Sequence, residues 1–267
     1  MKRVLGAVSY FNTVALVYEI ERQLPEYRIE FDLPSRLCRR LSTRELDVAL
    51  IPVVDALSHP DWAIVSDACI ACRGPVWSVK LLSRVPFPRI QTLALDEGSR
   101  TSIALARLIL TEQFGVVPSC TKLAIDDDYF ATRTDAVLVI GDRAMHDNTS
   151  TFPHIMDLGE AWRDWTGLPF VFAVWTAHHQ IERAELATVL SSARDRGVAN
   201  ASRIANERAA EYGLTVDQAK RYLTEHLHFV LGPAEREGLS LFMQKVAEHG
   251  LLPAASSVAA GDMVIAR

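Results

Sequence analysis

The chain has 267 residues, 49% hydrophobic and 23% charged, which excludes an intrinsically disordered protein and allows one large domain or two of ordinary size. A formal net charge of -5 without a lysine- and arginine-rich cluster excludes duplex nucleic acid as a partner but allows a small anion. No run approaches the roughly 18–20 apolar residues that span a bilayer, and the first residues lack a signal-peptide cleavage pattern. We therefore expect no membrane partner and a cytoplasmic location.

The first ninety residues alternate between strand and helix signals, a pattern that predicts a parallel sheet covered by helices. Helical spacing ends at Pro25, and a second helix is expected to follow Pro34 with Ser35 as its N-cap. The expected strands are 3–9, 27–33, 47–53, 62–72 and 76–85, and the expected helices are 13–24 and 36–46.

A second unit of the same kind follows, and the chain then becomes helical. Gly115 is the expected C-cap of its first helix, Thr215 opens a capping box, and Pro233 opens the last helix. The expected strands are 90–96, 121–125, 134–142 and 169–177, and the expected helices are 101–114, 157–168, 182–213 and from 233 to about 250.

These elements predict an α/β protein with two lobes around a ligand cleft. We expect residues 1–88 and 176–267 to form the first lobe, because the C-terminal helices would return to it, and residues 89–175 to form the second. Ligands of open α/β sheets bind outside the carboxyl ends of the strands. The loops at those ends are therefore the candidate sites.

Two candidate segments lie in the first half of the chain. Ser9, Tyr10 and Asn12 follow the first strand and supply the donors and acceptors expected of a small-molecule pocket, although Asn12 and Thr13 could simply cap a helix. Ser78, in the segment Arg73–Val79, is either a ligand-facing hydroxyl or a tolerated small residue of a strand.

A third segment, Ser99–Ser102, opens the helix expected at 101–114. A helix N-terminus offers unpaired N–H groups and a partial positive charge, so it can hold an anion. Ser99 is the expected N-cap for the N–H of Ser102; Thr101 and Ser102 add hydroxyls, and Arg100 adds a cation. Capping and anion binding are compatible here.

The fourth segment, Val137–Ala144, ends a strand. Gly141 allows a close approach of the backbone, and Asp142 could cap the next helix or face the cleft as a base. Motifs for phosphate loops, dinucleotide binding and serine hydrolases are absent.

The four cysteines and the histidines do not form a metal-binding pattern. Cys69 and Cys72 have C-x-x-C spacing, but they fall in a predicted strand and have no second pair, so we interpret them as structural thiols. His178 and His179 have no acidic partner at metal spacing and are expected at the surface. We expect neither a metal nor a cofactor.

Six segments in register resemble the chorismate dehydratase family of the futalosine route to menaquinone. The resemblance covers the chain from Arg3 to about Trp175, and Trp77 stands where we expect a more polar or basic residue. The segments are GAVSYFNT, LPSRL, ELDVALIPV, DEGSRTS, DAVLVIGDRA and DLGEAWRDWTGLPFVFAVW. The resemblance implies the type II periplasmic-binding-protein fold in a cytoplasmic enzyme.

The family's reaction converts chorismate into 3-[(1-carboxyvinyl)oxy]benzoate and water. Aromatisation of the ring drives it, so the resemblance implies no metal or redox cofactor. The enzyme must hold two carboxylates, orient the substrate and assist two proton movements.

The resemblance also implies roles for the candidate residues. The end of the predicted helix at Ser99–Ser102 would hold one carboxylate, with Arg100 either adding a charge or pointing away. Ser9, Tyr10, Asn12 and Ser78 would bind from the other lobe, and Gly141 would complete the wall. Asn12 and Asp142 are the candidate catalytic residues; the proton acceptor is either a substrate carboxylate or Asp142.

Three other functions remain as alternatives. A solute-binding protein for small anions such as aromatic carboxylates would use the same fold without catalysis. The effector half of a transcription regulator would need a helix-turn-helix before the first strand. A different pathway enzyme could act on a related aromatic acid.

Overall fold

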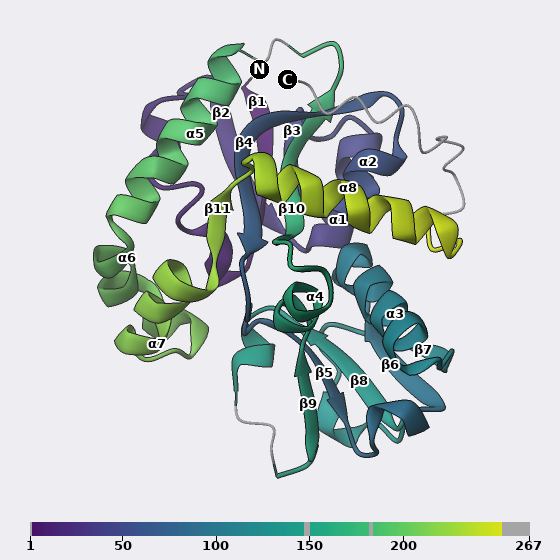
Figure 1. The fold of residues 1–267 in the computed structure, drawn as a ribbon. Helices are drawn as coiled ribbons and strands as arrows, with labels where there is room; N and C mark the ends of the chain where they lie inside the picture. Colours follow the sequence, from purple (N-terminus) through teal and green to yellow (C-terminus); the bar gives the residue numbers. More distant parts are fainter. Residues whose placement is uncertain (1, 147–149, 182–183, 253–267) are drawn as a thin grey trace.

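The computed structural model describes residues 2–146, 150–181 and 184–252, which form two lobes, each built on one sheet (Figure 1). Within these residues, the first lobe has a six-stranded sheet of order β11-β4-β10-β3-β1-β2. β1 is parallel to β2 and β3, whereas β10 is antiparallel to β3 and β4. The strands are Arg3–Val8 (β1), Tyr27–Asp32 (β2), Val48–Pro52 (β3), Trp62–Cys72 (β4), Phe170–His178 (β10) and His228–Val230 (β11).

The second lobe has, among the described residues, a five-stranded sheet of order β7-β6-β8-β5-β9. β6 is parallel to β7 and β8, and β5 is antiparallel to β8 and β9. The strands are Val79–Ser83 (β5), Thr92–Asp96 (β6), Ser119–Leu123 (β7), Ala136–Ile140 (β8) and His154–Asp157 (β9). The predicted α/β class is confirmed.

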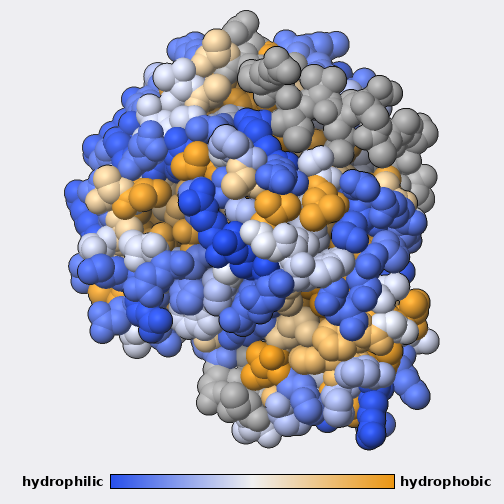
Figure 2. Space-filling model, in the orientation of Figure 1, coloured by the Kyte–Doolittle hydropathy of each residue, from blue (hydrophilic) through white to orange (hydrophobic). Residues whose placement is uncertain are grey.

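Helices cover both sheets and connect the lobes. α1 packs on β1 and β3, α5 packs on β4, and α8 contacts both β10 and α3. The helices are Pro34–Ser42 (α1), Val53–Ser58 (α2), Arg100–Phe114 (α3), Leu158–Thr166 (α4), Ala184–Ala199 (α5), Ala201–Arg208 (α6), Val216–Arg221 (α7) and Pro233–Glu248 (α8). Hydrophilic residues cover most of the face shown in Figure 2. No helix in the described ranges is long and apolar enough to cross a membrane.

The predicted lobe boundaries at 88/89 and 175/176 are wrong. β5 pairs with β8 and β9 and belongs to the second lobe, whereas β10 pairs with β3 and β4 and belongs to the first. The chain crosses between lobes at 73–78, after β4, and at 167–169, after α4. Both strands are mostly buried on both faces, although β5 contains Lys80 and Ser83, so their composition does not reveal which sheet they join.

The helix predicted at 13–24 is also wrong. This segment consists of turns with two short 3-10 pieces, Phe11–Thr13 (η1) and Ile20–Arg22 (η2). Glu19 adopts a left-handed conformation with φ 54°, which interrupts helical hydrogen bonding. A Cβ atom at Gly197 would lie 1.8 Å from the Ala15 carbonyl oxygen, so α5 packs directly on this segment. Tertiary packing thus overrides the local helical spacing.

Other boundaries differ for local reasons. The predicted N-cap at Ser35 is wrong: α1 begins at Pro34, and Leu33 is its N-cap. Proline is favoured at the first helical position, so the helix begins before Ser35. The helix predicted from 182 to 213 begins, in the described residues, at Ala184 and breaks at Asn200 between α5 and α6. The predicted caps at Ser99, Gly115 and Thr215 are confirmed.

Candidate functional site

A pocket lies between the two lobes, at the carboxyl ends of β1, β3 and β8. Its cavity volume is about 50 Å³, which is below the roughly 300–1,000 Å³ typical of small-molecule sites. Val8, Pro52 and Ile140 are the last residues of these three strands, and all three line the pocket. The full lining is Val8, Tyr10, Asn12, Pro34, Pro52, Ile70, Val76, Ser78, Val79, Ser99, Ser102, Ile140, Gly141, Phe172 and Ala173.

The N-terminus of α3 forms one polar side of this pocket. Ser99 is the N-cap: its hydroxyl accepts a hydrogen bond from the N–H of Ser102 at 3.3 Å, and the Ser102 hydroxyl donates to it at 3.2 Å. Both side chains line the pocket and are less than 10% exposed. The backbone N–H groups of Arg100 and Thr101 come before the first hydrogen bond of the helix and are not used within it. This end of α3 can therefore hold an anion.

The side chains of Arg100 and Thr101 do not line the pocket. For Thr101 this differs from the predicted substrate-binding role, and for Arg100 it agrees with the alternative that its side chain points away. The Arg100 guanidinium lies 2.8 Å from Asp55 in α2. The Thr101 hydroxyl accepts a hydrogen bond from the N–H of Val54 at 3.2 Å, at the start of the same helix. Both side chains therefore dock α3 of the second lobe onto α2 of the first.

Tyr10 reaches from the first lobe into a gap left by two glycines of the second. A Cβ atom at Gly141 would lie 2.7 Å from the Tyr10 ring, and one at Gly98 would lie 3.1 Å from its hydroxyl oxygen. Gly141 has φ +71°, a conformation that also favours glycine. Among the described residues, the buried Tyr10 hydroxyl has no hydrogen-bond partner, and burial raises the pKa of this phenol.

Asn12 and Ser78 form the other polar side. Asn12 follows β1, and its Oδ1 accepts a hydrogen bond from the Thr13 hydroxyl at 3.1 Å. Ser78 precedes β5, not within a strand as predicted, because Trp77 has φ +65° and breaks the extended backbone. Asp157 supports this bend by accepting hydrogen bonds from the N–H groups of Val76 (2.9 Å) and Trp77 (2.6 Å).

Asp142 does not line the pocket, and it does not cap the segment that follows it. Its carboxylate accepts the N–H of Phe11, at 3.2 Å from Oδ1 and 3.4 Å from Oδ2, and so caps η1 of the opposite lobe. Burial raises the pKa of Asp142 to about 6, and the hydrogen bond from Phe11 acts in the opposite direction. Asp142 is therefore a contact between the lobes whose carboxyl has a pKa raised by burial.

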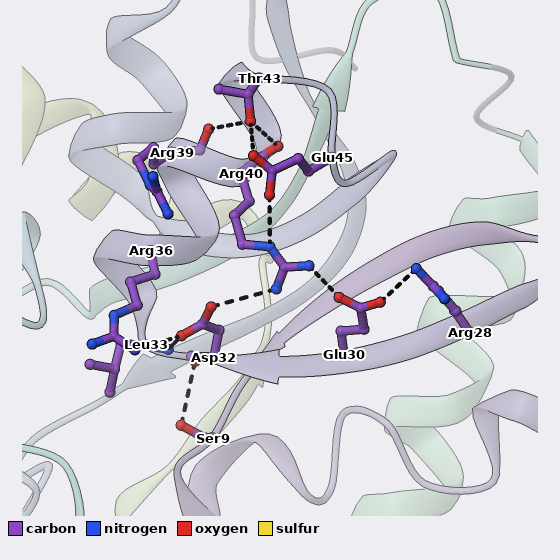
Figure 3. A network of polar contacts seen from close by, with 10 residues as sticks. All are labelled: Ser9, Arg28, Glu30, Asp32, Leu33, Arg36, Arg39, Arg40, Thr43 and Glu45. Carbon is purple, nitrogen blue, oxygen red and sulfur yellow. Dashed lines mark hydrogen bonds and ion pairs between the residues drawn. The ribbon is translucent and has the colours of Figure 1, made fainter.

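Ser9 is exposed and lies outside the pocket lining, contrary to its predicted substrate-binding role. Its hydroxyl donates to the backbone carbonyl of Asp32 at 3.4 Å. Figure 3 shows that this contact borders an ion-pair network in which Arg40 of α1 joins Glu30 and Asp32 of β2 and Glu45. The network fastens α1 to the edge strand of the first sheet.

Tyr222 is a site residue that the sequence did not indicate. It opens a π-helical turn after α7, is fully buried, and donates a hydrogen bond from its hydroxyl to Ser78 Oγ at 2.7 Å. Ser78 and Tyr222 are 144 positions apart, and one tyrosine in a helical region carries no functional signal.

The polar groups of the pocket are uncharged. Among the described residues, those that line it include no acid, histidine, lysine or arginine. Trp77 packs its ring on Tyr222 and His226, at 5.9 and 5.6 Å between centroids, and is not part of the lining. The pocket can therefore bind an anion through backbone N–H groups, hydroxyls and an amide, and not through a salt bridge.

Comparison with known proteins identifies the family. The family described as menaquinone biosynthesis matches residues 4–248. A curated chorismate dehydratase from Thermus thermophilus is 28% identical over 259 residues, covering 90% of this chain and 94% of its own. These matches confirm the resemblance that the six sequence segments indicated.

Solved structures confirm the fold. An Archaeoglobus fulgidus protein superposes with a TM-score of 0.77 at 16% identity, covering 94% of this chain and 98% of its own. The periplasmic aliphatic sulphonate binding protein SsuA from Escherichia coli superposes with a TM-score of 0.66 at 15% identity, covering 96% and 89%. The fold is thus the predicted periplasmic-binding-protein type with two α/β lobes, and the chain belongs to the menaquinone biosynthesis family.

Proposed function

We propose that the protein is a chorismate dehydratase, a hydro-lyase that converts chorismate into 3-[(1-carboxyvinyl)oxy]benzoate and water. The observation that carries this proposal is the pocket between the lobes, lined by hydroxyls, an amide and a helix N-terminus in a chain of this family. The 28% identity to a chorismate dehydratase over nearly the whole chain supports the same substrate.

The reaction requires recognition of a dianion and removal of water from the ring. Chorismate has two carboxylates and a ring hydroxyl at C4, and loss of the C3 proton with the C4 hydroxyl makes the ring aromatic. The C3–H bond breaks toward a base, its electron pair forms the new ring double bond, and the hydroxyl leaves with a proton as water. The protein must therefore orient the substrate and supply a proton to the leaving group.

The two polar sides of the pocket suit the two ends of such a substrate. One carboxylate would accept hydrogen bonds at the N-terminus of α3, from the first N–H groups and the Ser102 hydroxyl. Asn12 and Ser78, on the other side, would hydrogen-bond the leaving hydroxyl or the enolpyruvyl carboxylate. Ile70, Phe172 and the other apolar lining residues would cover the ring and exclude water.

The proton acceptor is a carboxylate of the substrate itself. Among the described residues that line the pocket, no side chain is a stronger base than an amide or a hydroxyl. Asp142, the alternative acceptor, directs its carboxylate to the N–H of Phe11. We assign Asp142 to closure of the lobes over the substrate, which holds the substrate carboxylate against its own ring.

Incubation of the purified protein with chorismate tests the function. Mass spectrometry should detect loss of one water, and NMR should detect the aromatic enolpyruvyl ether. Binding of chorismate without any product would favour the alternative of a solute-binding protein. Neither binding nor product would favour an enzyme for a different aromatic acid.

A matched pair of variants ties turnover to the pocket. Asn12→Ala removes the amide and should lower kcat/KM about tenfold to 100-fold, because the hydrogen bond to an ionic substrate is lost. Asn206→Ala removes an exposed amide of α6 that bonds only to the Ser202 carbonyl among the described residues, and should leave kcat/KM unchanged. Equal activity of the two variants would remove Asn12 from the mechanism.

A further inference from the structure

Tyr222 is hydrogen-bonded to one polar residue of the pocket and lies near another. Its hydroxyl donates to Ser78 Oγ at 2.7 Å, and the nearby Asn12 side chain lowers the pKa of the phenol. Asn12 lies in the loop after β1, and Ser78 lies in the loop before β5. A single phenol from the C-terminal helices therefore lies beside two loops whose residues are 66 positions apart in the chain.

The tyrosine ring is held by the residues that precede these two. Phe11 stacks on the ring at 6.3 Å between centroids, and Trp77 meets its edge at 5.9 Å. Trp77 has a left-handed backbone, which is costly for an aromatic residue and is found where surrounding contacts fix the geometry. Tyr222 is also the first residue of a π-helical turn, a backbone distortion that often occurs at functional sites.

The protonation state of Tyr222 fixes the direction of its hydrogen bond with Ser78. Complete burial raises its pKa, so the phenol stays neutral and has one hydrogen to donate. That hydrogen goes to Ser78 Oγ. Ser78 Oγ thus accepts from Tyr222, and its own hydrogen is left for a group in the pocket.

We propose that Tyr222 is a positioning residue that orients the Ser78 hydroxyl, so that Ser78 passes its proton to the substrate oxygen that leaves as water and regains one from the substrate carboxylate that took the C3 proton. This inference rests on the proposed dehydratase function. The hydrogen bonds run from Tyr222 to Ser78 and from Ser78 to the substrate. Each donor in this chain polarises the next, which makes the Ser78 hydroxyl a better donor than an isolated serine.

A double-mutant cycle with Tyr222→Phe and Ser78→Ala tests the inference. Tyr222→Phe keeps the ring and removes the hydroxyl; it should lower kcat about tenfold or more and leave KM within about twofold. In the Ser78→Ala background the same change should have no further effect, because Tyr222 acts only through Ser78. Tyr212→Phe is the matched control, since Tyr212 also packs on Phe11, at 5.1 Å, and its loss of a hydroxyl should leave kcat unchanged.

Three outcomes would overturn the inference. If Tyr222→Phe has wild-type kcat, the hydroxyl does not act. If the two changes are additive in kcat, Tyr222 does not act through Ser78 and has a structural role only. If the wild-type protein binds chorismate but forms no product, the proposed function fails and the inference with it, a result distinct from an active wild type with an unaffected Tyr222→Phe variant.

Discussion

The surface between the lobes has two regions of opposite character. The pocket lining consists of apolar, hydroxyl and amide groups. The contacts beside it include ionic groups: Arg100 pairs with Asp55, and Asp142 binds the N–H of Phe11. The charged side chains that drew attention in the sequence thus hold the lobes together, whereas neutral side chains face the space for the ligand.

The first turn of α3 takes part in both regions because of helix geometry. Successive residues of a helix are about 100° apart, so residues three apart lie on one face. Ser99 and Ser102 face the pocket, while Arg100 and Thr101 face α2. A ligand at this helix end would therefore contact the same turn that docks α3 onto α2.

Gly141→Ala should cause the largest loss of turnover, because the new methyl group would disturb both the pocket lining and the contacts between the lobes. The new Cβ would lie 2.7 Å from the Tyr10 ring and would force the lobes apart. A displacement of about 1 Å at an active site can cost about 100-fold in rate, so we expect at least that loss in kcat/KM with chorismate.

Gly115→Ala is the control for this variant. Gly115 shares the positive φ of Gly141 (+67° and +71°), although its ψ is 23° and that of Gly141 is -159°, and a Cβ at Gly115 would meet nothing within 4 Å. It should lose only about 1 kcal/mol of stability from backbone strain and keep its turnover. Equal turnover in the two variants would mean that Tyr10 and Gly141 do not need to be in contact for catalysis.

Ser102→Ala tests the pocket side of α3 and should have a smaller effect. Loss of one hydrogen bond to a charged group costs about 1.5–3 kcal/mol, so KM for chorismate should rise about tenfold or more. Thr111→Ala on the same helix removes a hydroxyl that bonds only to the Arg107 carbonyl among the described residues. A KM that rises equally in both variants would indicate a general effect on the helix.

The sequence predicted much of this organisation where the signal is local. The caps of α3 at Ser99 and Gly115 follow from residue type and spacing, and the ends of parallel strands place Asn12 and Gly141 at one pocket. These features depend on a few neighbouring residues or on a general rule of sheet topology.

What the sequence did not predict depends on contacts between distant segments. Tyr222 meets Ser78 only because the C-terminal helices return to the first lobe. Arg100 and Asp142 have partners on the opposite lobe, and no pattern in their own segments specifies those partners. β5 was assigned to the wrong lobe because its apolar composition suits either sheet.

Asp142→Asn separates closure from base catalysis. The amide oxygen can still accept the N–H of Phe11, so turnover should fall less than about tenfold, the effect of weakening one hydrogen bond. A loss of several orders of magnitude with chorismate binding retained would instead make Asp142 the proton acceptor.

The same variant has a signature in stability against pH. Burial raises the pKa of Asp142 from 3.8 to about 6, so the folded protein binds this proton more tightly than the unfolded chain. Its contribution to stability is fully present below the unfolded pKa and is lost as pH rises through about 6. The free energy of unfolding, measured as wild type minus variant, should fall by about 2–3 kcal/mol from pH 4 to 7; a constant difference would contradict the assignment.

Arg100→Gln should have the smallest effect on turnover. It is also the most direct test of the difference between the neutral pocket lining and the charged contacts between the lobes. If Arg100 only docks α3 onto α2, kcat/KM should stay within about threefold, because no charge is removed from the pocket, whereas loss of a substrate ion pair would cost about 2 kcal/mol or more. Stability should fall, because Asp55 is 1% exposed and would lose its ionic partner.

The Arg100→Gln, Asp55→Asn double variant should recover part of that stability by removing the unpaired charge. A large rise in KM that the double variant does not reverse would show that Arg100 contacts the substrate, and the division between neutral lining and charged contacts would then be wrong.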